Sequence, residues 1–195
     1  DPGKDRYCQL NINCPEGDDW QEQKSSSVIY MPVFANGDMS LCSGNLINNV
    51  KGDFKPYILT AAHCSGEEGT GDPIVGSFKG GFGIDQSKMD QWVFGFHYEK
   101  PRCNNSDYGF QTTKTLTGAT IRTYTSPFGY SDGMLLELKD EIPLDYRVYY
   151  SGWNATEQTW QSGAGIHHPA GDATKLALYN KGMTLGQWSE GNPQK

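Results

Sequence analysis

Several features that would assign a function directly are missing from this chain of 195 residues. Its five cysteines include no Cys-X-X-Cys pair, so a zinc knuckle is not expected. No apolar run approaches the roughly 20 residues that a membrane-spanning helix needs, and no signal-like segment opens the chain. Long runs of like-signed charge are also absent, and the formal net charge is -7. Neither nucleic acid nor an anionic membrane surface is therefore an expected partner.

Helical patterns and phosphate-binding loops are scarce as well. The glycine-rich stretches 66–71 and 76–83 lack the following helix and nearby lysine that a phosphate site requires, so we expect surface loops there. Only 36% of the residues are hydrophobic, yet aromatic residues reach 12%. That aromatic content is far from the composition of disordered chains and indicates a folded, loop-rich protein.

What the chain does contain is a series of short β-branched and aromatic runs separated by Gly, Pro, Asn and Asp clusters. This pattern predicts an all-β protein, either a sandwich or a barrel, with a hairpin at Asn36-Gly37 and one short helical turn near 61–64. The expected strands are 27–34, 39–47, 56–60, 91–97, 119–125, 134–138, 147–153, 164–168 and 175–179.

The segment most informative about chemistry runs from Tyr57 to Cys64, with the sequence Tyr-Ile-Leu-Thr-Ala-Ala-His-Cys. A strand ends in two small residues and then presents His63 beside Cys64, and a disulfide to Cys42 would clamp this turn. Such a rigid setting suits a general base, because misplacing an imidazole by about 1 Å costs much of its rate advantage. A buried structural histidine is the competing interpretation, and for a generic His-Cys pair it is the more frequent one.

The sequence of this segment, preceded by Cys-Ser-Gly-Asn-Leu-Ile at 42–47, resembles the histidine motif of chymotrypsin-like serine peptidases. Further segments resemble bacterial lysyl endopeptidases and follow that family's order from about Cys8 to the carboxyl end. These are Cys-Pro-Glu-Gly-Asp at 14–18, Leu-Ile-Asn-Asn at 46–49, Ser-Asp-Gly-Met-Leu-Leu-Glu-Leu at 131–138, Ser-Gly-Trp at 151–153 and Ile-His-His-Pro at 166–169. The loops 65–83 and 104–115 are more divergent.

The resemblance implies a double antiparallel β-barrel, with a first barrel complete in residues 1–142 and a second one only begun in residues 143–195. It assigns His63 as the general base and Asp132 as the carboxylate that accepts its Nδ1 proton. From its own surroundings, Asp132 is otherwise an ordinary turn residue. The order of His before Asp along the chain is also that of chymotrypsin-like enzymes.

The family's nucleophile is not found in this sequence. No Gly-X-Ser-Gly motif follows Asp132, since the later serines lie in Tyr-Ser-Gly-Trp (Ser151), Gln-Ser-Gly-Ala (Ser162) and Trp-Ser-Glu-Gly (Ser189). The resemblance therefore implies a secreted or periplasmic serine endopeptidase, cleaving after lysine, whose nucleophile comes from a carboxyl-terminal fragment and whose present chain is inactive by itself. The alternative is a non-catalytic, protease-like binding module that lacks the nucleophile.

The remaining expectations also follow from the family. Cys42 is expected to pair with Cys64, Cys14 with Cys103, and Cys8 with a cysteine outside this chain. Trp188 is expected to flank the lysine-binding pocket, although a core or rim tryptophan is an equal alternative. We expect no cofactor and no catalytic metal, because the adjacent residues His167 and His168 point to opposite faces of a strand.

Overall fold

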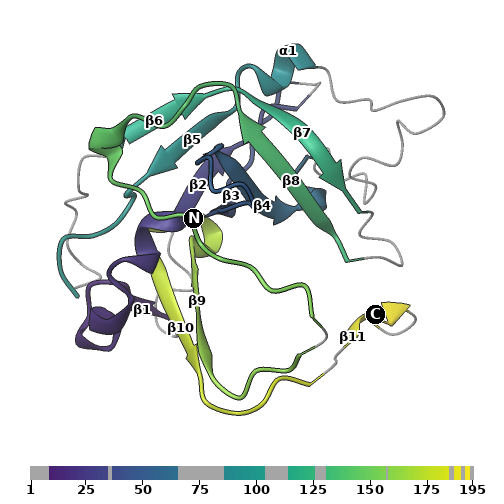
Figure 1. Ribbon diagram of the computed structural model, residues 1–195. Coiled ribbons are helices and arrows are strands. Elements are labelled where there is room, and N and C mark those ends of the chain that lie inside the picture. Colours follow the sequence, from purple (N-terminus) through teal and green to yellow (C-terminus); the bar gives the residue numbers. More distant parts are fainter. Residues whose placement is uncertain are drawn as a thin grey trace.

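A computed structural model of the chain describes residues 9–34, 37–65, 86–103, 114–125, 131–156, 158–184, 187–189 and 192–193. Most of its regular structure is β-strand, arranged in two lobes (Figure 1). In the described residues, the first lobe contains one sheet of seven strands, in the order β6-β5-β2-β3-β4-β8-β7. These strands are β2 (Ser27–Met31), β3 (Cys42–Ile47), β4 (Tyr57–Ala61), β5 (Val93–Phe96), β6 (Lys114–Thr117), β7 (Ala119–Tyr124) and β8 (Gly133–Leu138).

The two edges of this sheet are consecutive parts of one chain segment, because only Gly118 separates β6 from β7. Gly118 has φ +91, a conformation that favours glycine, and it bends the segment so that β6 pairs with β5 while β7 pairs with β8. Its N–H donates to the carbonyl of Trp92 and its carbonyl accepts from Lys139. The bend closes the sheet into a barrel, which leaves no unpaired edge at this side.

The core lies inside this first barrel. Alternation along β8 points Met134, Leu136 and Leu138 inward, as a strand period of two requires. Tyr30 is buried at the centre, with its ring stacked 5.4 Å from that of Phe94. Burial of these large side chains is the main source of the lobe's stability.

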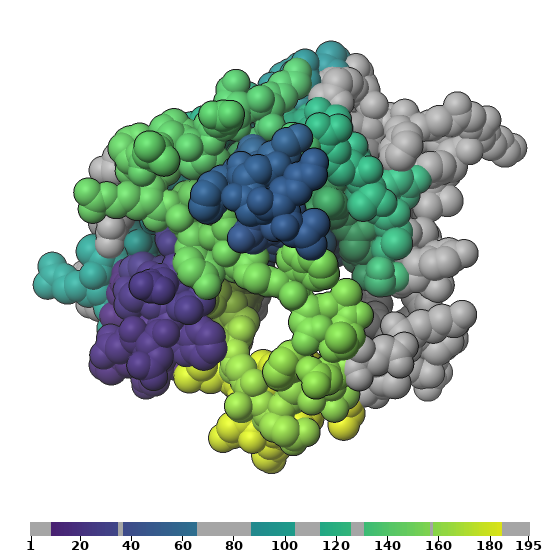
Figure 2. Space-filling view, viewed as in Figure 1, coloured from purple at the N-terminus to yellow at the C-terminus, as the bar shows by residue number. Residues whose placement is uncertain are grey.

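The second lobe is smaller and more open. Among the described residues it contains a three-stranded sheet in the order β1-β10-β9 and a separate β11–β12 pair. The bounds are β1 (Leu10–Asn11), β9 (Gly163–His167), β10 (Lys175–Tyr179), β11 (Gln187–Ser189) and β12 (Asn192–Pro193). Figure 2 shows an opening through this lobe, framed by green and yellow chain. The all-β double-barrel prediction is thus confirmed, with the first barrel complete and the second partial.

The helical elements are short. They are the 3₁₀ turns η1 (Pro15–Trp20), η2 (Gln23–Ser26), η3 (Ala62–Ser65), η5 (Leu144–Tyr146) and η6 (Pro169–Gly171), and the single-turn helix α1 (Gln86–Met89). The helical turn expected near 61–64 corresponds to η3. No helix in the described part of the chain is long and apolar enough to cross a membrane.

Each expected strand overlaps an observed one except 147–153, where the prediction is wrong. This segment pairs with the chain of β3 only through Ser151, whose N–H donates to Leu46 and whose carbonyl accepts from Asn48. β2 begins at Ser27, opposite Asn45 of β3. On the edge of β3 that faces β2, only the backbone groups after Asn45 are therefore free to bind the segment 147–153. The segment therefore runs as an extended connector between the lobes. Conversely, β1, β6, β11 and β12 were not expected as strands. Of the Asn36-Gly37 hairpin, Asn36 lies outside the described residues.

Candidate active site

His63 lies on the turn η3, directly after the strand β4. The preceding residue Ala62 is fully buried, and its N–H donates to the main-chain carbonyl of Asp132 over 2.8 Å. A side chain larger than a methyl group at position 62 would meet the packed core of the barrel. The two alanines before His63 thus allow its backbone to approach the start of β8 closely.

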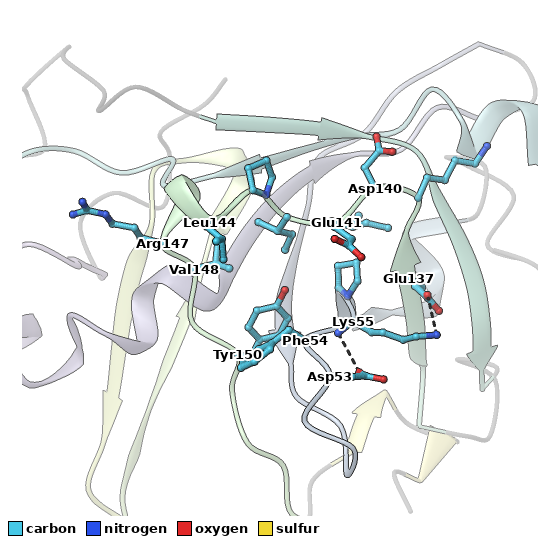
Figure 3. A pocket seen from close by; sticks show the side chains of 15 residues that line it. Asp53, Phe54, Lys55, Glu137, Asp140, Glu141, Leu144, Arg147, Val148 and Tyr150 are labelled. Atoms are coloured by element: carbon cyan, nitrogen blue, oxygen red, sulfur yellow. Dashed lines mark hydrogen bonds and ion pairs between the residues drawn. The ribbon is translucent and has the colours of Figure 1, made fainter.

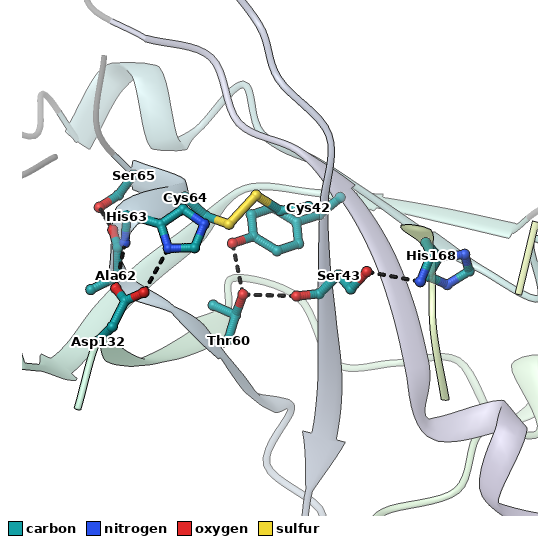
Figure 4. The surroundings of a disulfide bond; sticks show 10 residues. Cys42, Ser43, Thr60, Ala62, His63, Cys64, Ser65, Asp132 and His168 are labelled. Carbon is teal, nitrogen blue, oxygen red and sulfur yellow. Dashed lines mark hydrogen bonds and ion pairs between the residues drawn. A yellow bond between two sulfur atoms is a disulfide. The ribbon is translucent and has the colours of Figure 1, made fainter. Parts of the chain in front are cut away.

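Asp132 precedes β8 and accepts two hydrogen bonds from His63 (Figure 4). The imidazole Nδ1 lies 2.6 Å from Oδ2, and the backbone N–H of His63 donates to Oδ1 over 2.9 Å. Asp132 has φ 52, a left-handed conformation that aspartate tolerates better than most residues. Both carboxylate oxygens therefore face the histidine, one toward its ring and the other toward its main chain.

This geometry determines which imidazole nitrogen can act as a base. A carboxylate accepts hydrogen bonds but does not donate them, so Nδ1 is the donor and carries the proton. The lone pair of Nε2 is then available to accept a proton from another group. The side chain of His63 is 61% exposed and that of Asp132 only 29%, so the imidazole is accessible while the carboxylate is more sheltered.

A disulfide between Cys42 and Cys64 attaches the histidine turn to β3, with the Cα atoms 6.3 Å apart. A second disulfide joins Cys14 to Cys103 and spans 89 residues of sequence. The structure thus contains both bonds that the family resemblance implied. Cys8 lies outside the described residues.

Near the histidine turn, hydrogen bonds connect Tyr30 to Thr60, Thr60 to the main chain of Ser43, and the hydroxyl of Ser43 to His168. Thr60 Oγ1 donates to the carbonyl of Ser43 over 2.8 Å and lies 2.9 Å from Tyr30 Oη. Ser43 Oγ in turn accepts the backbone N–H of His168 over 2.9 Å. Burial raises the pKa of Tyr30 above its usual value, an effect that its hydrogen bond to Thr60 opposes and that the charge of Asp132 reinforces. Tyr30 consequently remains a neutral hydrogen-bond donor.

None of the other residues singled out in the sequence whose side chains the structure describes is hydrogen-bonded to His63. Among the described residues, the hydrogen bonds made by His63 go to Asp132 alone, and no serine hydroxyl takes part. Ser151 Oγ donates instead to Ser26 Oγ. Trp188 lies in β11, but its side chain is outside the described part of the structure.

Possible metal ligands are equally dispersed in the described residues, where no three His, Cys, Asp or Glu side chains lie close enough to hold one ion. His168 is only 4% exposed and its Nδ1 lies 3.2 Å from the carbonyl of Asp172. Its Nε2 is buried without a hydrogen-bond partner. Burial lowers the pKa of His168 to about 4 and also lowers the pKa of the half-buried His167.

A groove of about 900 Å³ lies elsewhere, between the loop before β4, the end of β8 and the connector (Figure 3). Phe54 and Tyr150 meet edge to face in it, with ring centres 5.6 Å apart. Lys55 and Glu137 form an ion pair at 3.8 Å on its rim. Neither His63 nor Asp132 lines the groove, so it is separate from the His63–Asp132 pair.

Sequence reasoning did not single out Tyr30, Thr60 or His168 as parts of this site. Thr60 belongs to the quoted histidine motif, but its identity there gives no hint of a partner 17 residues away. Tyr30 lies in the expected strand 27–34, a position that gives no sign that its hydroxyl meets Thr60. The signal for His168 was its place in the Ile-His-His-Pro segment, one of those that resemble the lysyl endopeptidases.

Comparisons with known proteins agree with the motifs. The family model described as "Lysyl endopeptidase, C-terminal domain" matches residues 2–194. The chain is 29% identical over 148 residues to a lysyl endopeptidase of Pseudomonas aeruginosa, an alignment that covers 75% of this chain and 27% of that protein. The chain thus spans about a quarter of the length of this curated relative. A solved structure described as "Structure of GrC" aligns with a TM-score of 0.47 and 17% identity, over 87% of this chain and 63% of that one. Because the family model covers nearly every residue, this chain belongs to the lysyl endopeptidase C-terminal domain family.

Proposed function

We propose that this chain is part of a serine endopeptidase that hydrolyses peptide bonds by acyl transfer. His63 acts first as the general base and then as the general acid, and Asp132 orients the imidazole and stabilises its charged form. The observation that carries the proposal is the pair of bonds from His63 to Asp132, at 2.6 Å from the ring and 2.9 Å from the backbone. Family membership supports the same reaction.

The nucleophilic serine, in this proposal, belongs to a polypeptide segment outside these 195 residues, and the chain is inactive without it. Two observations support the idea. No Gly-X-Ser-Gly motif follows Asp132 in the sequence, and the second lobe has an opening through it (Figure 2). A segment that filled this opening would complete the barrel and bring a serine and its oxyanion-binding N–H groups toward Nε2 of His63.

We further propose that the substrate is a protein or peptide cleaved after lysine. The name of the family supports this preference. Trp188 is proposed to form one wall of the pocket, where its ring would cover the methylenes of a lysine side chain. The acidic group that would bind the ammonium belongs, like the serine, to the completing segment.

The partner segment is proposed to be attached through Cys8 by a disulfide, and the protein to work outside the cytoplasm. The two disulfides of the structure support an oxidising compartment, since such bonds are rare in reducing ones. No cofactor or metal takes part in the proposed reaction.

A fluorophosphonate probe tests the proposal, because it reacts only with an activated serine. The natural protein is purified without reductant, labelled, and separated by electrophoresis with and without reductant. We expect the label on a second polypeptide that separates from the 21.6 kDa chain only after reduction. Matched peptides with lysine or arginine before the scissile bond then measure the primary specificity.

The opposite outcome is equally clear. If the protein is not labelled and carries no second polypeptide, the catalytic proposal is wrong and a binding module without a nucleophile is favoured. Labelling with equal cleavage after lysine and arginine would leave the reaction class intact and remove the lysine preference.

A further inference from the structure

Thr60 lies on the strand that leads to His63, and its hydroxyl is bound on two sides. Its proton goes to the carbonyl of Ser43, so the second bond, to Tyr30 Oη, is one in which Tyr30 donates. The tyrosine is almost completely buried among the aromatic side chains of the core. Thr60 Oγ1 is therefore fixed from β3 and from β2 at once.

These bonds lie at the point where β3 and β4 separate. The ladder between the two strands ends at the pair Asn45–Leu59, and Thr60 is the next residue of β4. Its side chain thus provides a link to β3 where the backbone no longer does. On its other side, Thr60 pairs with Met134 of β8, two residues after Asp132.

The same short part of β3 also contacts the second lobe. Ser43 Oγ accepts the N–H of His168, which follows β9, and the neighbouring Cys42 is bonded to Cys64 beside the histidine. Figure 4 shows the His63–Asp132 pair beside the Cys42–Cys64 disulfide and, as a separate set of hydrogen bonds, the links from Thr60 to Ser43 and from Ser43 to His168. A displacement of β4 relative to β3 would accordingly move the histidine turn relative to Cys42 and the second lobe, and would strain the pairing of β4 with β8, the strand that follows Asp132.

We propose that Thr60 is a positioning residue, whose hydroxyl fixes the direction in which β4 leaves β3 and thereby holds the His63 imidazole against Asp132. Its importance for catalysis rests on the proposed function. The geometry of the His63–Asp132 pair, however, is measurable in the protein whether or not it cleaves peptides. A hydroxyl that merely stabilised the barrel would leave that geometry unchanged.

The test compares Thr60→Val, which removes only the hydroxyl, with Thr60→Ser, which keeps it. Thr174→Val is the control, because the Oγ1 of Thr174 also donates to a main-chain carbonyl, that of Tyr98, and Thr174 is buried where Thr60 is partly buried. Each variant is made in the complete natural protein. The readouts are the NMR signal of the His63 Nδ1 proton, the thermal midpoint, and kcat and KM on a lysyl peptide.

We expect Thr60→Val to broaden or abolish the Nδ1 proton signal and to lower kcat about tenfold or more with KM changed less than about twofold. Thr60→Ser restores the Nδ1 proton signal and kcat. Thr174→Val lowers the thermal midpoint without changing the Nδ1 proton signal. An unchanged signal and kcat in Thr60→Val, with a thermal loss like that of the control, would overturn the proposal.

Tyr30→Phe keeps the test decisive should Thr60→Val fail to fold. It removes the tyrosine hydroxyl and leaves the bond from Thr60 to Ser43, so we expect a weakened Nδ1 signal, whereas a native signal would again overturn the proposal. A wild-type protein without peptidase activity would contradict the proposed function alone, because the NMR comparison would still decide the role of Thr60.

Discussion

Gly171 lies directly against Leu41, so closely that a Cβ atom at position 171 would overlap Leu41 Cδ1. This contact joins the turn between β9 and β10 to the residue that precedes Cys42. It lies beside the bond from His168 to Ser43, so two contacts attach the second lobe to the chain that supports the histidine turn. The lobes therefore meet at the start of β3, the part of the chain to which the Cys42–Cys64 disulfide attaches the histidine turn.

We expect Gly171→Ala to destabilise the protein by about 1–2 kcal/mol, mainly because Gly171 has φ +72, where an L-residue is strained. Leu41 is 50% exposed, so its Cδ1 atom can swing away from an added methyl group. Leu41→Ala should accordingly restore only a small part of the loss. Urea unfolding of the two single variants and the double variant measures this, and complete restoration would show that crowding, not the backbone, is the cause.

His168 is expected to make stability depend on pH. Its pKa is about 4 in the folded protein and 6.5 in the reference state, so the unfolded chain binds more protons between these values. The contribution of His168 to the unfolding free energy is fully present above pH 6.5. It is lost as the pH falls toward 4, by about 3 kcal/mol in all. The ring of Tyr98 packs against His168, and the charge of His167 lowers its pKa further, whereas the backbone hydrogen bond to Asp172 and the charge of Asp172 oppose the shift.

The pH prediction is measured as the difference in unfolding free energy between pH 7.5 and pH 4.5. We expect His168→Phe to reduce this difference, whereas His167→Phe reduces it less because His167 is only half buried. Poor packing of the new ring would lower stability equally at both pH values and leave the comparison valid. An identical pH dependence in wild type and His168→Phe would contradict the assignment.

The sequence predicts local features of this fold better than its long-range pairing. Alternation of apolar residues predicts β8, and small residues before a histidine predict a tight turn. Nothing in composition indicates that His63 meets Asp132, 69 residues later, so that pair followed from the family resemblance. β6 has no strong apolar signal, because only Leu116 of its four residues is a large apolar one, and the barrel closes through it all the same.

The errors have a common physical cause, which is competition for partners. The segment 147–153 has the composition of a strand, but β3 already pairs with β2 and β4 and leaves it only the groups around Ser151. Likewise, Tyr30 and Thr60 lie in the expected strands 27–34 and 56–60, but the sequence does not indicate that their hydroxyl groups meet. Residue type predicts which groups need partners, and only the fold decides which ones they find.

The two disulfides are expected to affect different properties. Replacing Cys42 and Cys64 by alanine opens a loop of 22 residues and should cost about 3 kcal/mol, whereas removing the Cys14–Cys103 bond, which spans 89 residues, should cost about 4.5 kcal/mol. Only the first change releases the turn that carries His63. We therefore expect the variant without the Cys42–Cys64 bond to weaken the His63 Nδ1 proton signal, although it is the less destabilised of the two.

Urea unfolding and NMR of the two double variants check this order. Each serves as the control for the other, because both lose one covalent link and no buried polar group. Loss of the Nδ1 signal in the Cys14–Cys103 variant, while it still folds, would show that the histidine turn depends on global stability rather than on its own disulfide.

Asp132→Asn is expected to lower kcat about 10⁴-fold while leaving the fold nearly intact. Asparagine tolerates the left-handed backbone of this residue, and its Oδ1 can still accept the N–H of His63. Its side-chain NH₂, however, donates to Nδ1, which forces the imidazole proton onto Nε2 and removes the lone pair that would accept a proton from serine. Asp132→Ala is the comparison, because it also leaves the His63 N–H without its partner and should unfold at lower temperature. Peptidase activity within about tenfold of wild type in Asp132→Asn would mean that the tautomer of His63 does not limit the reaction.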